Sequence, residues 1–171
     1  EESRHNINTS RSYLDQKIAG NSTPLYGINT GFGSLCNVAI KNEHLTQLQE
    51  NLVRSHACGT GDYVPKSIVK LMILLKIQSL SYGHSGVHID TVERLIDFYN
   101  LDILPVVYTQ GSLGASGDLA PLAHLSLPLI GEGHVWDGDE PAFAKAVLEK
   151  QHLMPIKLHT KEGLSILNGT P

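Results

Sequence analysis

Apolar residues recur at helical spacing along most of the chain, and this periodicity limits the possible folds more than any other feature of the sequence. It predicts a helix over about residues 43–58. The apolar stripe of this helix consists of Leu45, Leu48, Leu52 and Val53. His56 follows Leu52 by four residues, so it extends the stripe instead of facing solvent.

Three further helices are predicted. Between residues 66 and 80, apolar side chains cover most of the circumference, which predicts a buried central helix. The next helix is marked by Val92, Leu95, Ile96 and Tyr99. The last is expected to hold Pro141 in its first turn and to carry Phe143, Val147 and Leu148. With short strands expected at "VWD" and "MPIKLH", the predicted fold is mainly α, with glycine-rich loops and a few short strands.

Composition narrows the class of protein. The 171 residues suffice for one domain with a core, and 41% hydrophobic and 18% charged residues indicate a folded chain. A net charge of −4 gives no basic surface for nucleic acid, and no apolar run is long enough to cross a membrane. The start, "EESRHNINTS", lacks the apolar core of a signal peptide. Cys36 and Cys58 have no metal-binding spacing, so we expect reduced thiols and a cytoplasmic protein.

Two glycine-rich loops are candidate functional sites, because clustered glycines allow close backbone approach or a positive φ. One is "YGINTGFGSL" at residues 26–35, and the other is "GSLGASGDLAPLAH" at residues 111–124. Neither contains the Lys and Ser or Thr of a phosphate-binding P-loop, and the glycine spacing of a dinucleotide site fails at its third position. The nucleophile elbow Gly-x-Ser-x-Gly is also incomplete, because Asp118 stands at its last glycine. Either loop alone is also compatible with an ordinary tight turn.

The histidines give little support for a metal site. His84 and His88 have a spacing that can place two ligands on one helix face. However, Gly83 and Gly86 interrupt this segment and no third ligand is evident, so no metal site is predicted.

The tripeptide Ala115-Ser116-Gly117 permits a reaction of the chain with itself. Attack of the Gly117 nitrogen on the Ala115 carbonyl carbon needs a tight bend, which only small residues allow. Ring closure releases one water, and loss of the Ser116 hydroxyl as a second water leaves a conjugated methylidene group. A helix is expected to begin at Asp118 and Leu119, so this electrophile would lie at the positive end of a helix dipole.

Four segments resemble the aromatic amino acid ammonia-lyases: "YGINTGFG", "LQENLVRSHACGTG", "GSLGASGDLAPLAH" and "KEGLSILNGT". They occur in the family's order and span roughly residues 25–170. The resemblance implies that residues 1–171 are the helical N-terminal part of an aspartase/ammonia-lyase-like fold. Because the sequence has no initiator Met and stops at "LNGTP", we expect a fragment that lacks the family's C-terminal helical bundle and is inactive alone. Pro171 is not the residue that the family pattern leads us to expect there.

The resemblance also implies a prosthetic group and site residues. In this family Ala-Ser-Gly becomes 4-methylidene-imidazol-5-one (MIO), which assigns the precursors to Ala115, Ser116 and Gly117, with no external cofactor. The proposed base that removes the β-proton of the substrate corresponds to Tyr26. The implied substrate-binding residues are Ser55, His56, Asn168 and, from the Tyr26 loop, Asn29.

Two of these residues have ordinary structural alternatives. A histidine such as His56 on an apolar stripe is typical of a core position, and an asparagine before Gly169 is typical of a helix C-cap. In the family, the arginine that binds the substrate carboxylate comes from the part beyond residue 171, and active sites combine residues from several subunits of a homotetramer.

The pair Ser55-His56 favours L-histidine as the small-molecule substrate, with trans-urocanate and ammonia as products in the first step of histidine breakdown. One alternative is a tyrosine ammonia-lyase or tyrosine aminomutase that uses the same group. Another is a non-catalytic helical binding or assembly module.

Overall fold

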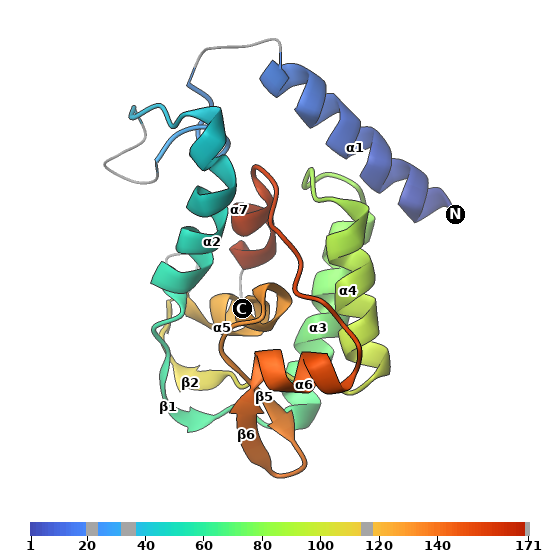
Figure 1. Ribbon diagram of the computed structural model, residues 1–171, viewed down its shortest axis with the longest axis vertical. Helices are drawn as coiled ribbons and strands as arrows, with labels where there is room; N and C mark the ends of the chain where they lie inside the picture. Colours follow the sequence, from blue (N-terminus) through green and yellow to red (C-terminus); the bar gives the residue numbers. More distant parts are fainter. Residues whose placement is uncertain (20–23, 32–36, 114–117, 170–171) are drawn as a thin grey trace.

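The computed structural model describes residues 1–19, 24–31, 37–113 and 118–169. Its helices are α1 (Glu2–Ala19), α2 (Leu45–His56), α3 (Lys66–Ser81), α4 (Ile89–Asn100), α5 (Ala120–Ser126), α6 (Ala144–Lys150) and α7 (Glu162–Leu167), with the 3-10 turns η2 (Asn42–His44) and η3 (Leu127–Ile130). Figure 1 shows α3 and α4 side by side, α2 on the opposite side, and the short α5 and α7 between them, with α1 across one end. The prediction of a mainly helical fold is confirmed.

The predicted helix over residues 43–58 is confirmed as η2 followed by α2. Leu45, Leu52 and Val53 are buried, as their spacing indicates. Gln49 lies on the same face with no exposed surface, and its Oε1 accepts a hydrogen bond from the Gly163 N–H at 3.0 Å. A Cβ on Gly163 would lie 2.8 Å from the Gln49 carbonyl oxygen, so this close crossing of α2 and α7 requires glycine.

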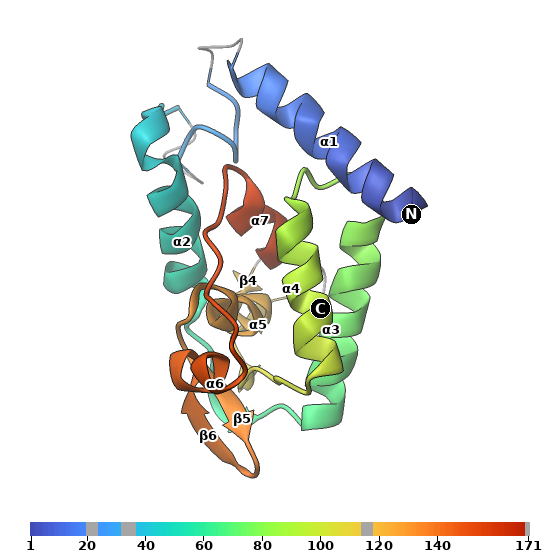
Figure 2. The same cartoon turned by 45° about the vertical axis from the view of Figure 1, so that its right-hand side comes forward.

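The helix predicted over residues 66–80 is also confirmed, as α3. The prediction that this helix is buried around its whole circumference is wrong. One stripe is buried, and it contains Val69, Ile73, Lys76 and Leu80. The apolar side chains that remain exposed are Ile68, Leu71, Leu74 and Leu75. The reason is that the elements packed on α3, chiefly α4 and α1, cover only part of its circumference (Figure 2).

The next predicted helix is α4. Val92, Leu95 and Phe98 are buried, whereas Ile96 is 39% exposed and so lies at the edge of the stripe. Because these buried residues join the same core cluster as those of α3, the two helices form one packed layer.

The strands form three two-stranded antiparallel ladders: β1 (Thr60–Tyr63) with β2 (Tyr108–Gln110), β3 (Ser112–Leu113) with β4 (Asp118–Leu119), and β5 (His134–Asp137) with β6 (Glu140–Phe143). The strand expected at "VWD" is confirmed in β5, but no strand forms at residues 154–159. Placing Pro141 in the first turn of a helix is wrong. The two-residue turn Gly138-Asp139 pairs Pro141 with Trp136, and α6 begins only at Ala144.

The periodicity did not indicate α1, which has few apolar residues. Ile7 and Leu14 are buried on its inner face, and Arg11 between them is only 8% exposed. The Arg11 Nη1 donates hydrogen bonds to the carbonyl oxygens of Gly86 at 3.1 Å and Thr160 at 3.0 Å. Arg11 therefore joins α1 to the turn before α4 and to the segment before α7. Among the described residues, none of the helices has the length and apolar character of a membrane span.

The short helix α7 is held by the buried carboxylate of Glu162, its first residue. Glu162 Oε1 accepts hydrogen bonds from the His88 N–H at 2.8 Å and the Thr91 hydroxyl at 2.7 Å. Its Oε2 accepts one from the His159 N–H at 2.7 Å. Because His88 is the N-cap residue of α4, the negative charge also lies at the favourable end of that helix dipole.

We expect Glu162→Ala to lower the free energy of unfolding by about 3 kcal/mol or more, because three donors lose a charged acceptor and two of them belong to the backbone. Glu162→Gln keeps one acceptor oxygen, so its free energy of unfolding should lie between those of the wild type and Glu162→Ala. Urea denaturation measures the change. The control is Glu149→Ala at an exposed position of α6, and an equal effect of both alanine substitutions would contradict the prediction.

Candidate functional site

The hairpin at residues 112–119 carries the tripeptide singled out in the sequence. Ser112 pairs with Leu119, and Leu113 pairs with Asp118, in an antiparallel register. Leu113 and Asp118, the two residues that flank positions 114–117 in the sequence, therefore lie about one strand spacing apart, roughly 5 Å. Ala115, Ser116 and Gly117 lie outside the described residues. The close pairing of the two flanking strands is compatible with the bend that ring closure requires.

The residues directly after the tripeptide do not begin the helix, contrary to the prediction from the sequence. Asp118 and Leu119 form strand β4, and α5 begins at Ala120 with Pro121 in its first turn. The predicted start of the helix is two residues too early, because Asp118 and Leu119 pair with Leu113 and Ser112.

The hairpin lies against the segment that follows α2. A Cβ on Gly111, whose φ is +124°, would lie 3.0 Å from the Gly59 Cα. The Gly59 N–H donates a hydrogen bond to His124 Nε2 at 3.0 Å, which joins the same segment to α5. Since Nε2 accepts, the neutral ring carries its proton on Nδ1. Burial lowers the pKa of His124, which favours this neutral form.

His56 is the last residue of α2 and is partly buried. Its Nδ1 lies 2.9 Å from the Leu52 carbonyl oxygen, to which the Ser55 hydroxyl also donates at 3.0 Å. Because a carbonyl can only accept, Nδ1 carries the proton and the neutral ring presents Nε2 as an acceptor. His56 thus extends the apolar stripe of α2, and its imidazole ring is also held in a defined orientation. A ligand with an N–H group is a suitable partner for that acceptor.

Asn168 follows α7 as its C-cap residue, as the alternative reading of Asn168-Gly169 expected. Its side chain is exposed, and its N–H donates to the Leu164 carbonyl oxygen at 2.9 Å. Its own carbonyl oxygen accepts a hydrogen bond from Lys76 Nζ at 2.7 Å. A Cβ on Gly169 would lie 3.1 Å from Leu122 Cδ1, so the end of α7 also packs closely on α5.

A groove of about 560 Å³ lies where α3, β2 and α5 meet, and we call it the α3–α5 groove. Met72 and Leu75 of α3 and Leu122 of α5 give it apolar walls, while Lys76 and Asn168 add polar atoms. Asn168 is therefore on a surface that can contact a partly apolar molecule or chain segment.

Tyr26 lies elsewhere. It is 61% exposed in a turn in which Asn29 Oδ1 accepts from the Leu25 N–H at 2.6 Å. The Asn29 carbonyl oxygen accepts from the Ile40 N–H at 2.8 Å, and residue 40 leads directly into η2 and the start of α2. His56 ends the 12-residue α2, about 18 Å away along its axis. The end of α2 with His56 and the end of α7 with Asn168 therefore lie near α5, which the 112–119 hairpin precedes. The turn with Tyr26 and Asn29 is bonded to the segment that leads into the start of α2. Figure 1 shows α5 and α7 beside α2.

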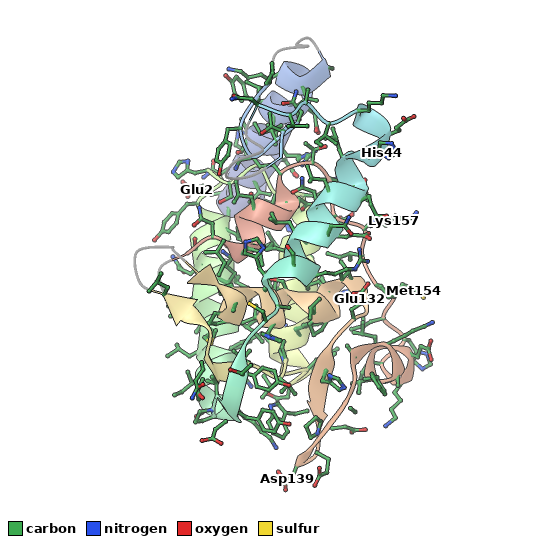
Figure 3. The ribbon with its side chains drawn as sticks, turned by 90° about the vertical axis from the view of Figure 1, so that its left-hand side faces the viewer. Glu2, His44, Glu132, Asp139, Met154 and Lys157 are labelled. Carbon is green, nitrogen blue, oxygen red and sulfur yellow. The ribbon has the colours of Figure 1, made fainter. Side chains whose placement is uncertain are left out.

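An ion-pair cluster fixes the end of α2 that carries Ser55 and His56. Arg54 Nη2 lies 2.6 Å from a carboxylate oxygen of Glu132 and 3.0 Å from one of Glu50. These partners raise the pKa of Arg54. Glu132, labelled in Figure 3, follows η3, so the pair ties the end of α2 to the turn after α5 and η3.

Comparisons with known proteins identify the family to which this arrangement belongs. The sequence profile of the family described as aromatic amino acid lyase matches residues 1–171. The chain belongs to the aromatic amino acid lyase family. It is 50% identical over 167 residues to a histidine ammonia-lyase of Deinococcus radiodurans, which covers 98% of this chain and 32% of that protein. It thus spans about a third of the length of the curated relatives it matches.

Solved structures agree with this family assignment. A tyrosine aminomutase from Streptomyces globisporus matches with a TM-score of 0.92 at 36% identity, over 99% of this chain and 31% of the other. A histidine ammonia-lyase from Trypanosoma cruzi matches with a TM-score of 0.89 at 34% identity, over 99% and 32%. The expected ammonia-lyase fold is therefore confirmed.

Two residues near the site were missed by the sequence analysis, namely Lys76 and His124. His124 stands in a quoted motif, but nothing in the motif shows that its ring meets Gly59, 65 residues earlier. Lys76 interrupts an apolar stripe, and a charge at such a position is a signal that a search for buried polar groups detects. Within the described residues, no group of three or more His, Cys, Asp or Glu side chains could hold a metal ion.

Lys76 should make stability depend on pH. Burial lowers its pKa from the ordinary 10.5 to about 8. Between these two pH values the unfolded chain binds a proton that the folded chain does not, so this group makes stability rise with pH there. Relative to Lys76→Met, the wild type should gain about 3 kcal/mol between pH 7 and pH 11, at about 1.4 kcal/mol per pH unit. Chemical denaturation over this range measures the difference, and a constant difference would disprove it.

Proposed function

We propose that the complete protein is a histidine ammonia-lyase that converts L-histidine into trans-urocanate and ammonia. The observation that carries the proposal is the 50% identity to a histidine ammonia-lyase over nearly the whole chain, together with the His56 imidazole that the Leu52 carbonyl oxygen orients. The reaction would be the first step of histidine breakdown, in the cytoplasm.

The proposed prosthetic group is MIO, formed from Ala115, Ser116 and Gly117 without an external cofactor. Family membership supports it, as does the pairing of Leu113 with Asp118, which brings the two residues that flank the tripeptide segment close together. When formed, the group supplies an electrophile that makes the substrate amine a better leaving group. Its formation removes two waters, one from the Ala115 carbonyl oxygen and one from the Ser116 hydroxyl.

His56 would recognise the substrate side chain. The Leu52 carbonyl and the Ser55 hydroxyl hold its ring, so Nε2 can accept a hydrogen bond from the N–H of a substrate imidazole. In this proposal Ser55 orients His56, and the Asn168 amide binds the substrate near its carboxylate.

Tyr26 would remove the β-proton in a site completed by another copy of the chain. The length of α2, with the Tyr26 turn near its start and His56 at its end, supports a site completed by a second chain. Asn29 would support Tyr26 by holding the turn, through its bond with the Leu25 N–H. A homotetramer provides such shared sites.

The second candidate is a lyase or aminomutase that acts on tyrosine. It is favoured by the tyrosine aminomutase of Streptomyces globisporus, which has the same fold over 99% of this chain. A non-catalytic binding or assembly module is the remaining alternative, for which the shared fold is equally suitable.

Substrate choice is tested with the complete protein and separate L-histidine and L-tyrosine. We expect urocanate from histidine and no coumarate or β-tyrosine from tyrosine, because His56 pairs best with a second imidazole. His56→Phe should remove most of the histidine activity, since it retains the ring volume but not the acceptor. Product analysis by liquid chromatography measures both, and formation of tyrosine products alone would replace the proposal with the second candidate.

Formation of the prosthetic group is tested by intact mass. The complete protein should weigh about 36 Da less than its sequence, because two waters leave the main chain and Ser116. Ser116→Ala should show no such loss and form no urocanate above background. Ser112→Ala, at an exposed strand position of the same hairpin, is the matched control and should keep the loss. A complete protein at its unmodified mass would favour the non-catalytic module.

A further inference from the structure

Lys76 occupies a position built for an apolar residue. It lies in α3 at four- and three-residue steps from Leu80 and Ile73, which have no exposed surface, and it is itself only 6% exposed. A buried ammonium loses its hydration, and a methionine of similar length would fill the same space without that cost. Nothing in the packing of α3 therefore requires a lysine.

Among the described residues, the Lys76 ammonium makes one hydrogen bond, which joins it to the end of α7, 92 residues further along the chain. Its Nζ donates to the Asn168 carbonyl oxygen at 2.7 Å. Among the described residues no carboxylate lies within ion-pair distance of Lys76, and burial alone accounts for its lowered pKa. The charge is thus directed at the backbone of a single residue.

This contact fixes the direction in which Asn168 leaves the helix. Asn168 has extended backbone angles, φ −76° and ψ 132°, so its carbonyl oxygen points away from the helical hydrogen-bond pattern of α7. Lys76 holds that oxygen, and the contact of Gly169 with Leu122 holds the next residue against α5. The main chain from which the exposed Asn168 side chain extends is thereby held beside the helix that follows the 112–119 hairpin.

We propose that Lys76 is a positioning residue that acts through Asn168. Its ammonium holds the main chain of Asn168 so that the side-chain amide lies where the substrate binds. The proposal rests on the proposed function for the role of the Asn168 amide, whereas the anchoring of residue 168 by Lys76 stands on the geometry alone. Lys76 itself does not touch the substrate.

The test uses Lys76→Met in the complete protein, with Lys70→Met as the matched control. Lys70 lies on the same helix, is more exposed and pairs with Asp102. We expect Lys76→Met to lower kcat for histidine about 10- to 100-fold, because small displacements of binding groups have large effects on rate. Its melting temperature should not fall, since the buried charge is removed. Lys70→Met should retain kcat within about twofold.

A double mutant separates positioning from general packing. If Lys76 acts through the Asn168 amide, Lys76→Met should lower kcat no further once Asn168→Ala is present. Independent, multiplicative losses in the double mutant would overturn the proposal. An unchanged kcat in Lys76→Met would also overturn it.

Hydrogen exchange makes the outcome independent of the assigned reaction. The peptide covering residues 162–169 should exchange faster in Lys76→Met than in the wild type or Lys70→Met. Equal exchange in all three proteins would overturn the anchoring. A wild type that forms product from neither histidine nor tyrosine would overturn the proposed function and, with it, the role of Lys76 in positioning the amide. The exchange result would still decide whether Lys76 anchors residue 168.

Discussion

The buried carboxylate of Glu162 is the interaction on which the rest of the arrangement depends. A helix of six residues such as α7 has too few internal hydrogen bonds to be stable alone, so its place must come from its neighbours. Glu162 joins α7 to the start of α4 and to the segment that precedes α7, and Gly163 allows α2 to approach closely. At the other end Lys76 holds the carbonyl oxygen of Asn168. Two buried groups of opposite charge therefore fix both ends of one short element.

The sequence predicted the elements whose stability comes from a continuous apolar stripe. The helices α2 and α4 each bury three or more residues on one face, and that spacing is visible without any partner. It did not predict α1, whose place depends on Arg11 and two carbonyl oxygens far along the chain. Pro141 misled the prediction, because a proline suits the first turn of a helix and an edge strand equally well. Pairing with Trp136 decided between them.

The candidate site was predictable where a motif carries the chemistry and unpredictable where a contact carries it. Small residues on both sides of Ser116 indicate a compressed backbone, and His56 is placed by helical spacing alone. By contrast, His124 and Lys76 act through main-chain atoms of Gly59 and Asn168, and any residue type provides those atoms. No local pattern specifies such a partner. The visible trace is a charged residue at an apolar position, as Lys76 is between Ile73 and Leu80.

The rigid attachment of α2 has a consequence for the proposed enzyme. Gln49 bonds to Gly163 near the middle of α2, and Arg54 pairs with Glu132 near its end. Both contacts keep the helix itself in place, so a movement of the Tyr26 turn relative to His56 would occur in the loop before α2. Under the proposed function, α2 therefore presents His56 to the substrate from a fixed position. Assembly of the subunits would then complete the catalytic machinery around a helix whose position is already fixed within one chain.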